Sequence, residues 1–174
     1  MHVVNTNKKI LILVEEYYED LELWYPKIRL EEEGYRVIVA GPDKRLFHGR
    51  HGLTIEPDAI FNEINEKEFK GLIIPGGFAP DWLRRSEKVL KLVKQFNANN
   101  KLIAFICHAG WVPISAGILR GKHVTSIPSI KDDLINAGAL WEDSPFVIDG
   151  NLVTSRRPTD LPSFMKASIE ILNR

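Results

Sequence analysis

The sequence predicts an α/β fold in which one doubly wound, mostly parallel sheet is sandwiched between helices. Short apolar runs that suit buried strands alternate with segments of helical periodicity, and this alternation is typical of a parallel sheet covered on both faces. The chain has 174 residues, a length that fits one domain. No repeat and no linker rich in proline, glycine or serine divides it. We therefore expect residues 1–174 to form a single domain, with a flexible start at residues 1–8.

The first part of the chain predicts a β-α-β unit. Residues 9–14 form an apolar run that suits a central strand, and residues 35–40 suit a second one. Asp20 is a candidate N-cap for the helix between them, and Gly34 is a candidate stop. Pro26 should kink this helix or mark where its regular part begins, because proline has no amide hydrogen. The large apolar residues that recur on one helical face are Leu21, Trp24, Tyr25 and Ile28.

Strand and helix signals alternate through the rest of the chain. Residues 41–58 suit an irregular hairpin at a sheet edge. Residues 71–74 suit a third buried strand, and residues 102–106 suit a fourth. Ser86 is a candidate N-cap for an amphipathic helix that ends within residues 97–100. Beyond residue 107 we expect a helix, a strand over 123–126, a helix over 130–137, strands near 146–148 and 152–154, and a helix over about 159–172.

Charge and composition limit the classes of partner. Lysine plus arginine and aspartate plus glutamate both number 23, so the formal net charge is zero and nucleic acid is not an expected partner. Residues 1–8 are polar, and no stretch has the run of apolar residues that a membrane span requires. We therefore expect a cytoplasmic protein without a membrane partner. The sequence carries no recognisable nucleotide motif, phosphate loop or metal-ligand cluster, so we predict neither a cofactor nor a metal.

Cys107 is the only cysteine of the chain and the leading candidate for a functional residue. It follows the apolar run 102–106 and precedes residues at helical spacing, which places it in a strand-to-helix turn. Such a turn presents the side chain at the carboxyl edge of the sheet, where ligands bind in open α/β folds, and beside the positive end of a helix. This setting favours a nucleophilic thiolate. The competing interpretation is a small buried cysteine with no chemical role.

Three strand ends should meet at this edge of the sheet. They are the loop after Val14, the turn at residues 75–77 and Cys107 itself. A carboxylate from the first could hydrogen-bond the sulfur, and backbone amides from the second could stabilise an oxyanion. This combination is typical of a hydrolase with a cysteine nucleophile.

Several motifs, by their order and spacing, make the chain resemble the PfpI/ThiJ family of intracellular proteases and related deglycases. They lie at residues 18–23, 49–52, 74–80, 106–108, 114–117, 130–138 and 154–156. The resemblance covers nearly the whole chain. It implies a flavodoxin-like fold, and it implies self-association into homodimers or larger rings such as hexamers.

The resemblance also implies a role for each site residue. Cys107 would be the nucleophile, His108 its base, and Glu19 the carboxylate that touches the sulfur. The backbone amides of Gly77 and His108 would form the oxyanion site. Asp81 stands at the position where protease-type members have a glutamate that completes the triad from a neighbouring subunit.

Physical chemistry adds conditions and alternatives to these roles. An ionised Glu19 would oppose a thiolate, so Glu19 should keep its proton, through a raised pKa, and donate a hydrogen bond to the sulfur. His108 is either a base that folds back onto the sulfur or a surface or interface histidine that contributes only its amide. Asp81 could equally cap a short helix.

Other residues have structural interpretations or depart from the family pattern. We expect His51 to be a turn residue, and Arg156 and Arg157 to be solvated or ion-paired. Ala109-Gly110 replaces the Gly-Pro that commonly follows the Cys-His pair, and Ile127 replaces a frequent tyrosine. Both departures affect how a substrate would be held.

Two classes of function fit these features. The first is a cysteine-dependent enzyme, either a peptidase or a glyoxalase and protein deglycase acting on methylglyoxal-type carbonyls. Both reactions begin with attack of Cys107 on the carbonyl of a peptide or small carbonyl substrate. The second is a non-catalytic stress-response redox sensor or chaperone in which Cys107 is an oxidisable thiol. A class I glutamine amidotransferase is disfavoured because no His-x-Glu pair follows Cys107.

Overall fold

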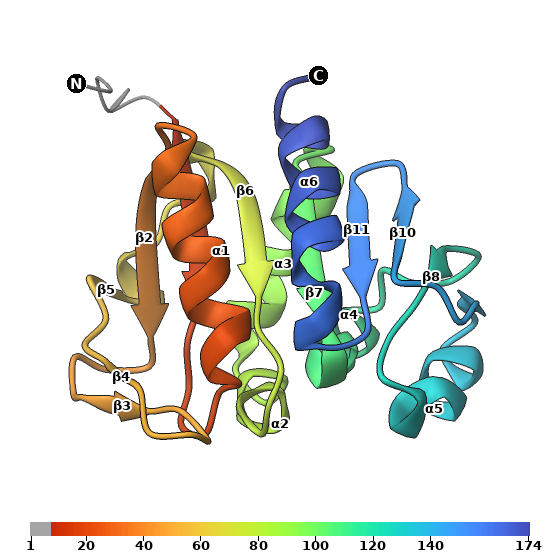
Figure 1. Ribbon diagram of the computed structural model, residues 1–174, viewed down its shortest axis with the longest axis horizontal. Coiled ribbons are helices and arrows are strands. Elements are labelled where there is room, and N and C mark those ends of the chain that lie inside the picture. Colours follow the sequence, from red (N-terminus) through yellow and green to blue (C-terminus); the bar gives the residue numbers. More distant parts are fainter. Residues whose placement is uncertain (1–7) are drawn as a thin grey trace.

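A seven-stranded sheet forms the centre of the computed structural model, which describes residues 8–174. The flexible start predicted at residues 1–8 lies outside the described residues, apart from Lys8. The strand order is β10-β11-β7-β6-β1-β2-β5 (Figure 1). All neighbouring strands are parallel except β10, which runs antiparallel to β11. The bounds are β1 (Lys9–Leu13), β2 (Arg36–Gly41), β5 (Ala59–Ile60), β6 (Phe69–Ile74), β7 (Leu102–Ile106), β10 (Phe146–Asp149) and β11 (Leu152–Ser155).

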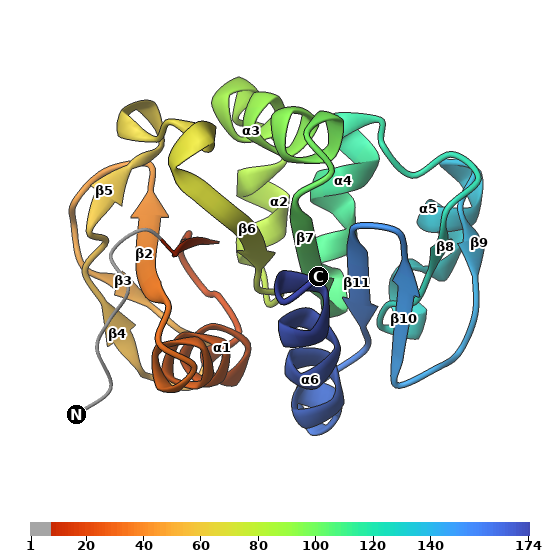
Figure 2. The ribbon, with the colours of Figure 1, turned by 90° about the horizontal axis from the view of Figure 1, so that it is seen from above.

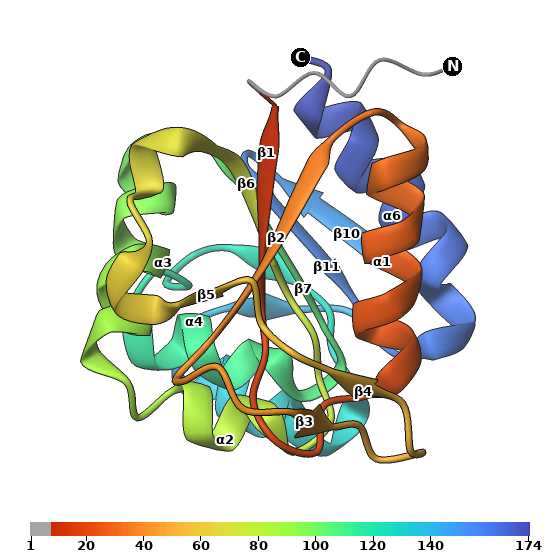
Figure 3. The same cartoon turned by 90° about the vertical axis from the view of Figure 1, so that its left-hand side faces the viewer.

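Helices cover both faces of this sheet, as the view from above shows (Figure 2). One face carries α1 (Asp20–Glu32) and α6 (Leu161–Leu172). The other carries α2 (Ala79–Leu83), α3 (Glu87–Ala98) and α4 (Trp111–Ala116), and the side view agrees (Figure 3). A further helix, α5 (Lys131–Asn136), lies beyond β10. The predicted doubly wound, flavodoxin-like fold is confirmed.

The central strands are buried on both sides, which explains their uninterrupted apolar sequences. The side chains of residues 10–13 in β1 and 102–106 in β7 are at most 2% exposed. Because β1, β6 and β7 are parallel neighbours, the loops that follow them meet at one edge of the sheet. This edge lies at the bottom of Figure 1, close to α2 and to the small strands β3 and β4.

Two short ribbons flank the main sheet. The antiparallel pair β3 (Phe47–His48) and β4 (Thr54–Ile55) is the predicted irregular hairpin. The other is the parallel pair β8 (His123–Val124) and β9 (Leu140–Trp141), in which β8 forms only the first half of the strand predicted over 123–126. Neither β5 nor β9 is predicted, because two residues are too few to show an alternating pattern.

The start of α1 differs from the prediction. The helix begins at Asp20 itself, and Glu19 is its N-cap residue without a side-chain capping bond. Asp20 is buried and accepts hydrogen bonds from the backbone N–H groups of His51 at 2.8 Å and Leu53 at 2.7 Å. Its carboxylate therefore holds the loop after β3 instead of capping the helix.

The buried face of α1 is not the one predicted from its large apolar residues. Leu21 and Ile28 are 53% and 59% exposed in the single chain. The helix continues past Pro26 to Glu32, so Pro26 does not mark its regular beginning; the bond that Pro26 cannot make is the one to the carbonyl of Glu22. The buried residues of this helix are Asp20, Glu22, Leu23, Pro26 and Leu30.

Other helix boundaries agree with the prediction. Gly34, with φ +84°, follows the end of α1 in the left-handed conformation that glycine favours. The Ser86 hydroxyl accepts a hydrogen bond from the Val89 N–H at 3.3 Å and caps α3. The last helix begins at Leu161, after a 3₁₀ turn over Pro158–Asp160. Within residues 8–174, every helix is too short or too polar to span a bilayer.

Candidate active site

Cys107 sits at the carboxyl end of β7, directly after Ile106, at the start of a 3₁₀ turn that leads into α4. Its φ is +62°, in the left-handed region that residues other than glycine rarely adopt. This sharp change of direction after a buried strand is the predicted strand-to-helix turn. The residue is only 5% exposed in the single chain, so the sulfur lies at the bottom of the site.

Two backbone amides and one imidazole surround the sulfur. The N–H groups of His108 and Gly77 donate hydrogen bonds to it, which is the pair of amides predicted for an oxyanion site. The Nδ1 atom of His108 lies 3.3 Å from the sulfur, and its Nε2 atom lies 3.1 Å from the Ser129 hydroxyl. Of the two alternatives for His108, the structure therefore shows the ring folded back onto the thiol.

The environment of His108 keeps its imidazole neutral. Burial lowers the pKa of His108, and the positive charge of Arg50 lowers it further. The ring also packs against Trp111, with 5.4 Å between ring centroids. A neutral imidazole whose Nε2 faces a hydroxyl can receive a proton at Nδ1, where it meets the thiol.

The carboxyl group against the sulfur belongs to Glu22 and not to Glu19. Glu22 is fully buried, and its Oε2 accepts a hydrogen bond from the Gly76 N–H at 2.8 Å. Burial raises the pKa of Glu22 to about 8, although hydrogen bonds from Gly76 and Cys107 act to lower it. Its Oε1 is buried and has no hydrogen-bond partner among the described residues.

Glu19 faces a different group of side chains. Its carboxylate oxygens lie 3.4 Å from Nη1 of Arg50 and 3.4 Å from Nε2 of His51. Its charge also acts on Cys107, but less strongly than the charge of Glu22. The prediction that Glu19 is the residue that touches the sulfur is therefore wrong: it places the carboxylate one helical turn too early.

The surroundings of Cys107 favour its protonated thiol in this conformation. Burial raises the pKa of Cys107 to about 12, the charge of an ionised Glu22 adds to the rise, and the two amides oppose it. Desolvation therefore opposes the thiolate that the helix end is expected to favour. A substrate-bound reaction must therefore remove the thiol proton, and His108 is the base in contact with it.

The turn after β6 needs both of its glycines. A Cβ at residue 77, where φ is +81°, would lie 2.5 Å from the backbone N of Glu19 and the backbone O of Tyr17. A Cβ at residue 76 would lie 2.5 Å from Glu22 Oε2. The glycines thus let the loop after β1 and the carboxyl of Glu22 approach the nucleophile.

Asp81 does not reach Cys107 within one chain. It is a half-buried residue of α2 and forms an ion pair with Arg85. Phe78, and not Asp81, is the N-cap of this helix, so the capping alternative is also wrong. A role for Asp81 across a subunit interface stays a prediction.

The remaining predicted residues are placed as follows. His51 lies in the turn after β3, as expected. Arg156 is ion-paired with Asp143 at 2.7 Å and Asp160 at 2.9 Å, also as expected. The backbone N–H of Ile127 lies 3.4 Å from the carbonyl of Cys107. Position 127, where a tyrosine is frequent in the family, therefore borders the site.

Within residues 8–174, no three histidine, cysteine, aspartate or glutamate side chains cluster so as to hold a metal ion.

Comparison with known proteins identifies the family. A family model described as the DJ-1/PfpI family matches residues 8–171. The chain belongs to the DJ-1/PfpI family. A deglycase from Pyrococcus abyssi is 45% identical to it over 164 residues, which cover 94% of this chain and 99% of the relative. The Bacillus subtilis protein YraA, named as a candidate cysteine protease, is 38% identical over 167 residues, which cover 95% and 99%.

A solved structure in the DJ-1/PfpI family has the same fold. It is the crystal structure of an Anabaena variabilis protein with one DJ-1/ThiJ/PfpI-like and one ferritin-like domain. The TM-score is 0.94 at 38% sequence identity, and the match covers 95% of this chain and 48% of that one. This chain therefore spans about half of that two-domain protein.

Proposed function

We propose that this DJ-1/PfpI protein is a cysteine-dependent glyoxalase and deglycase that acts on methylglyoxal and its adducts. The proposal rests on one observation, a fully buried Glu22 whose pKa is raised to about 8 beside the Cys107 thiol. A carboxyl group that gains and loses its proton near neutral pH can move protons during a reaction. The deglycase name of the Pyrococcus abyssi relative supports the same chemistry.

The first step of the proposed reaction forms a bond between the sulfur and a carbonyl carbon. His108 takes the thiol proton as the sulfur adds to the aldehyde carbon, and it returns that proton to the new oxygen, which gives a hemithioacetal. The amides of Gly77 and His108, which point at the sulfur, are close enough to stabilise the oxygen while it is negative. For a hemiaminal adduct on an amine, the sulfur instead replaces the amine at the former aldehyde carbon: the C–N bond breaks, His108 passes the thiol proton to the leaving amine, and the same hemithioacetal results.

The second step rearranges the hemithioacetal without a redox partner. His108 removes the proton from the former aldehyde carbon while Glu22 gives its proton to the neighbouring ketone oxygen, which forms an enediol. His108 then protonates the ketone-derived carbon, and Glu22 takes the proton from the hydroxyl beside the sulfur. Water hydrolyses the resulting thioester to lactate and restores the thiol, so one methylglyoxal and one water become one lactate.

A peptidase is the second candidate, and the contact between His108 Nδ1 and the Cys107 sulfur is the observation that favours it. Peptide hydrolysis needs an acid for the amine that leaves, and a protonated imidazole is usually stabilised by a carboxylate. In the described part of the chain, Nε2 of His108 faces Ser129. A carboxylate for the peptidase would have to come from a second subunit.

The deciding experiment compares two substrates. Purified wild-type protein and the Cys107→Ser variant are each incubated with methylglyoxal and, separately, with a quenched fluorescent peptide. We expect lactate to form only with the wild type. Lactate formation by Cys107→Ser at the wild-type rate, or no lactate in either case, would contradict the proposal. Peptide cleavage alone would select the peptidase. If neither substrate is turned over, a further incubation with peroxide that shows stoichiometric consumption would select the redox sensor.

A further inference from the structure

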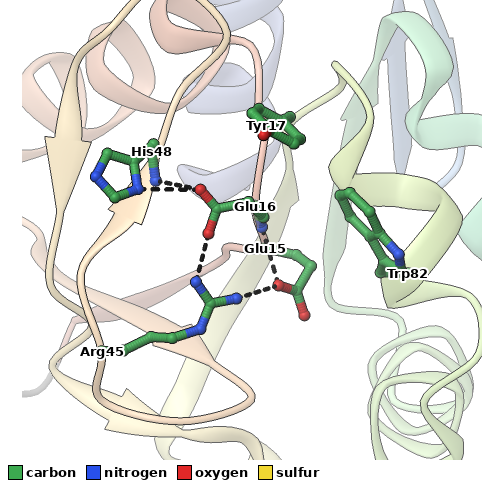
Figure 4. A pocket seen from close by; sticks show the side chains of 6 residues that line it. All are labelled: Glu15, Glu16, Tyr17, Arg45, His48 and Trp82. Atoms are coloured by element: carbon green, nitrogen blue, oxygen red, sulfur yellow. Dashed lines mark hydrogen bonds and ion pairs between the residues drawn. The ribbon is translucent and has the colours of Figure 1, made fainter.

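A cleft of about 620 Å³ opens near the candidate active site and takes no part in the reaction proposed above. It is lined by Glu15, Glu16, Tyr17, Arg45, His48 and Trp82 (Figure 4). Residues 15–17 lie in the loop after β1, and Trp82 belongs to α2, beyond the end of β6. The cleft therefore lies at the same carboxyl edge of the sheet as Cys107.

The cleft and the oxyanion site share a stretch of backbone. The carbonyl of Tyr17 accepts a hydrogen bond from the Phe78 N–H at 2.8 Å, and it packs directly against Gly77. The Gly77 amide in turn points at the Cys107 sulfur. The backbone of Tyr17, Gly77 and Phe78 therefore joins the cleft to the oxyanion site.

Carboxylates outnumber cations around this cleft. Arg45 is ion-paired with Glu16, and its guanidinium nitrogens lie 3.4 Å from Glu15 and 3.6 Å from Asp43. Nδ1 of His48 lies 3.0 Å from Glu16. Glu15 and Glu16 line the cleft and Asp43 lies beside it, so these three carboxylates exceed Arg45 by two charges, and by one if His48 also carries a proton.

Two aromatic rings form the wall opposite the Arg45 and His48 side chains. Tyr17 is 52% exposed, and its ring centroid lies 6.2 Å from that of Trp82. Figure 4 shows Glu15 between Arg45 and this aromatic wall, whereas Glu16 turns toward His48. Aromatic faces attract cations, and a carboxylate beside them adds to that attraction.

Glu15 is the carboxylate with capacity left for a ligand. Its Oε1 accepts the Glu16 N–H at 2.9 Å, and Arg45 approaches only to 3.4 Å because it pairs mainly with Glu16. Partial burial raises the pKa of Glu15, and the nearby carboxylates of Asp43 and Glu16 add to the rise, while the Glu16 N–H and Arg45 oppose it. A positively charged ligand would also oppose this rise.

We propose that this cleft binds a protonated amine or guanidinium, as carried by a lysine or arginine side chain of a substrate that bears a carbonyl adduct nearby. The inference rests on the proposed function for its link to catalysis, and it names the substrate class: adducts on basic peptides. The ammonium or guanidinium lies between Glu15 and the rings of Tyr17 and Trp82, while the adduct carbonyl reaches Cys107.

The test uses two peptides that carry no reactive carbonyl. Acetyl-Ala-Lys-Ala-amide has the ammonium, and acetyl-Ala-norleucine-Ala-amide has a similar aliphatic side chain without it. Binding of each to the whole protein is measured by titration calorimetry at low salt, for the wild type, Glu15→Gln and Trp82→Leu. Glu32→Gln is the matched control, because it removes the same charge from the exposed end of α1.

We expect the wild type to bind the lysine peptide at least tenfold more tightly than the norleucine peptide. This ratio should fall at least fivefold in Glu15→Gln and in Trp82→Leu, and it should be unchanged in Glu32→Gln. Equal binding of the two peptides, or an unchanged ratio in both cleft variants, overturns the inference. If one variant fails to fold, the other decides. Because neither peptide can react, a protein that makes no lactate still gives a clear answer here.

Discussion

Glu22 and Cys107 meet at the backbone of Gly76. A Cβ at residue 76 would lie 2.5 Å from Glu22 Oε2 and 2.7 Å from Cys107 Cβ. The same glycine donates its N–H to Glu22 at 2.8 Å. The carboxyl and the thiol can therefore approach each other only because this position has no side chain, and the proposed proton transfers depend on that approach.

Gly76→Ala should damage both stability and activity. Overpacking of this kind lowers the free energy of unfolding by about 1–3 kcal/mol, and displacement of Glu22 should reduce lactate formation at least tenfold. Gly121→Ala is the control, because residue 121 has φ +74° but open space around its Cα, so that variant carries only backbone strain. Denaturant titration and lactate assays measure both effects. Full activity in Gly76→Ala would show that the contact is dispensable.

Glu22→Gln should lower the pKa of Cys107, because the charge of Glu22 is the second-largest cause of its rise after burial. Glu19→Gln should lower it less, since Glu19 contributes the smallest of the named effects. The ultraviolet absorbance of the thiolate, followed against pH, gives the pKa in each variant. An equal or larger shift in Glu19→Gln would restore the original assignment of Glu19.

Stability should fall as the pH rises from about 5 to 8. The folded-state pKa of Glu22 is about 8, against 4.5 for the free side chain. The folded protein therefore binds more protons than the unfolded chain in this window; the stabilising contribution is complete below pH 4.5 and is lost by about pH 8. Across this window, the unfolding temperature of the wild type should fall by several degrees more than that of Glu22→Gln. Parallel curves for the two proteins would contradict the assignment.

The outward face of α1 should mediate self-association. Leu21 and Ile28 are exposed one above the other, with Trp24 and Tyr25 half-buried between them. Exposed apolar surface of this kind is typical of subunit interfaces. Light scattering should show at least a dimer for the wild type and a smaller species for the double variant Leu21→Glu with Ile28→Glu. The control Leu140→Glu, at an exposed leucine of β9, should leave the molar mass of the assembly as it is in the wild type. A monomeric wild type would refute this proposal.

The strands and the position of the nucleophile could be predicted because they depend on local patterns. Residues 102–106 are apolar without interruption because β7 is buried on both faces, and the change of period after them places Cys107 in the turn. The two-residue strands β5 and β9 could not be predicted in this way, since they arise from the pairing of loops that are distant in sequence.

The carboxylate of the site was the harder part, although the sequence held a usable signal. Glu22 shares a helical face with Pro26 and Leu30, at intervals of four residues, and that face is buried. The larger apolar side chains of this helix form a more conspicuous stripe, but Leu21 and Ile28 are exposed and Trp24 and Tyr25 are only half-buried. The raised pKa of Cys107 could not be predicted from sequence, because it follows from burial by segments that only the folded chain brings together.

The left-handed backbone of Cys107 has a consequence for how the protein should lose function. A non-glycine residue at φ +62° carries a strain on the order of 1–3 kcal/mol, which the surrounding structure must hold in place. Slight loosening of the short helix α4 would let this residue relax toward an ordinary conformation and swing the sulfur away from its amides, while the central strands remained assembled. Catalytic activity should therefore be lost at urea concentrations and temperatures well below those that unfold the whole protein.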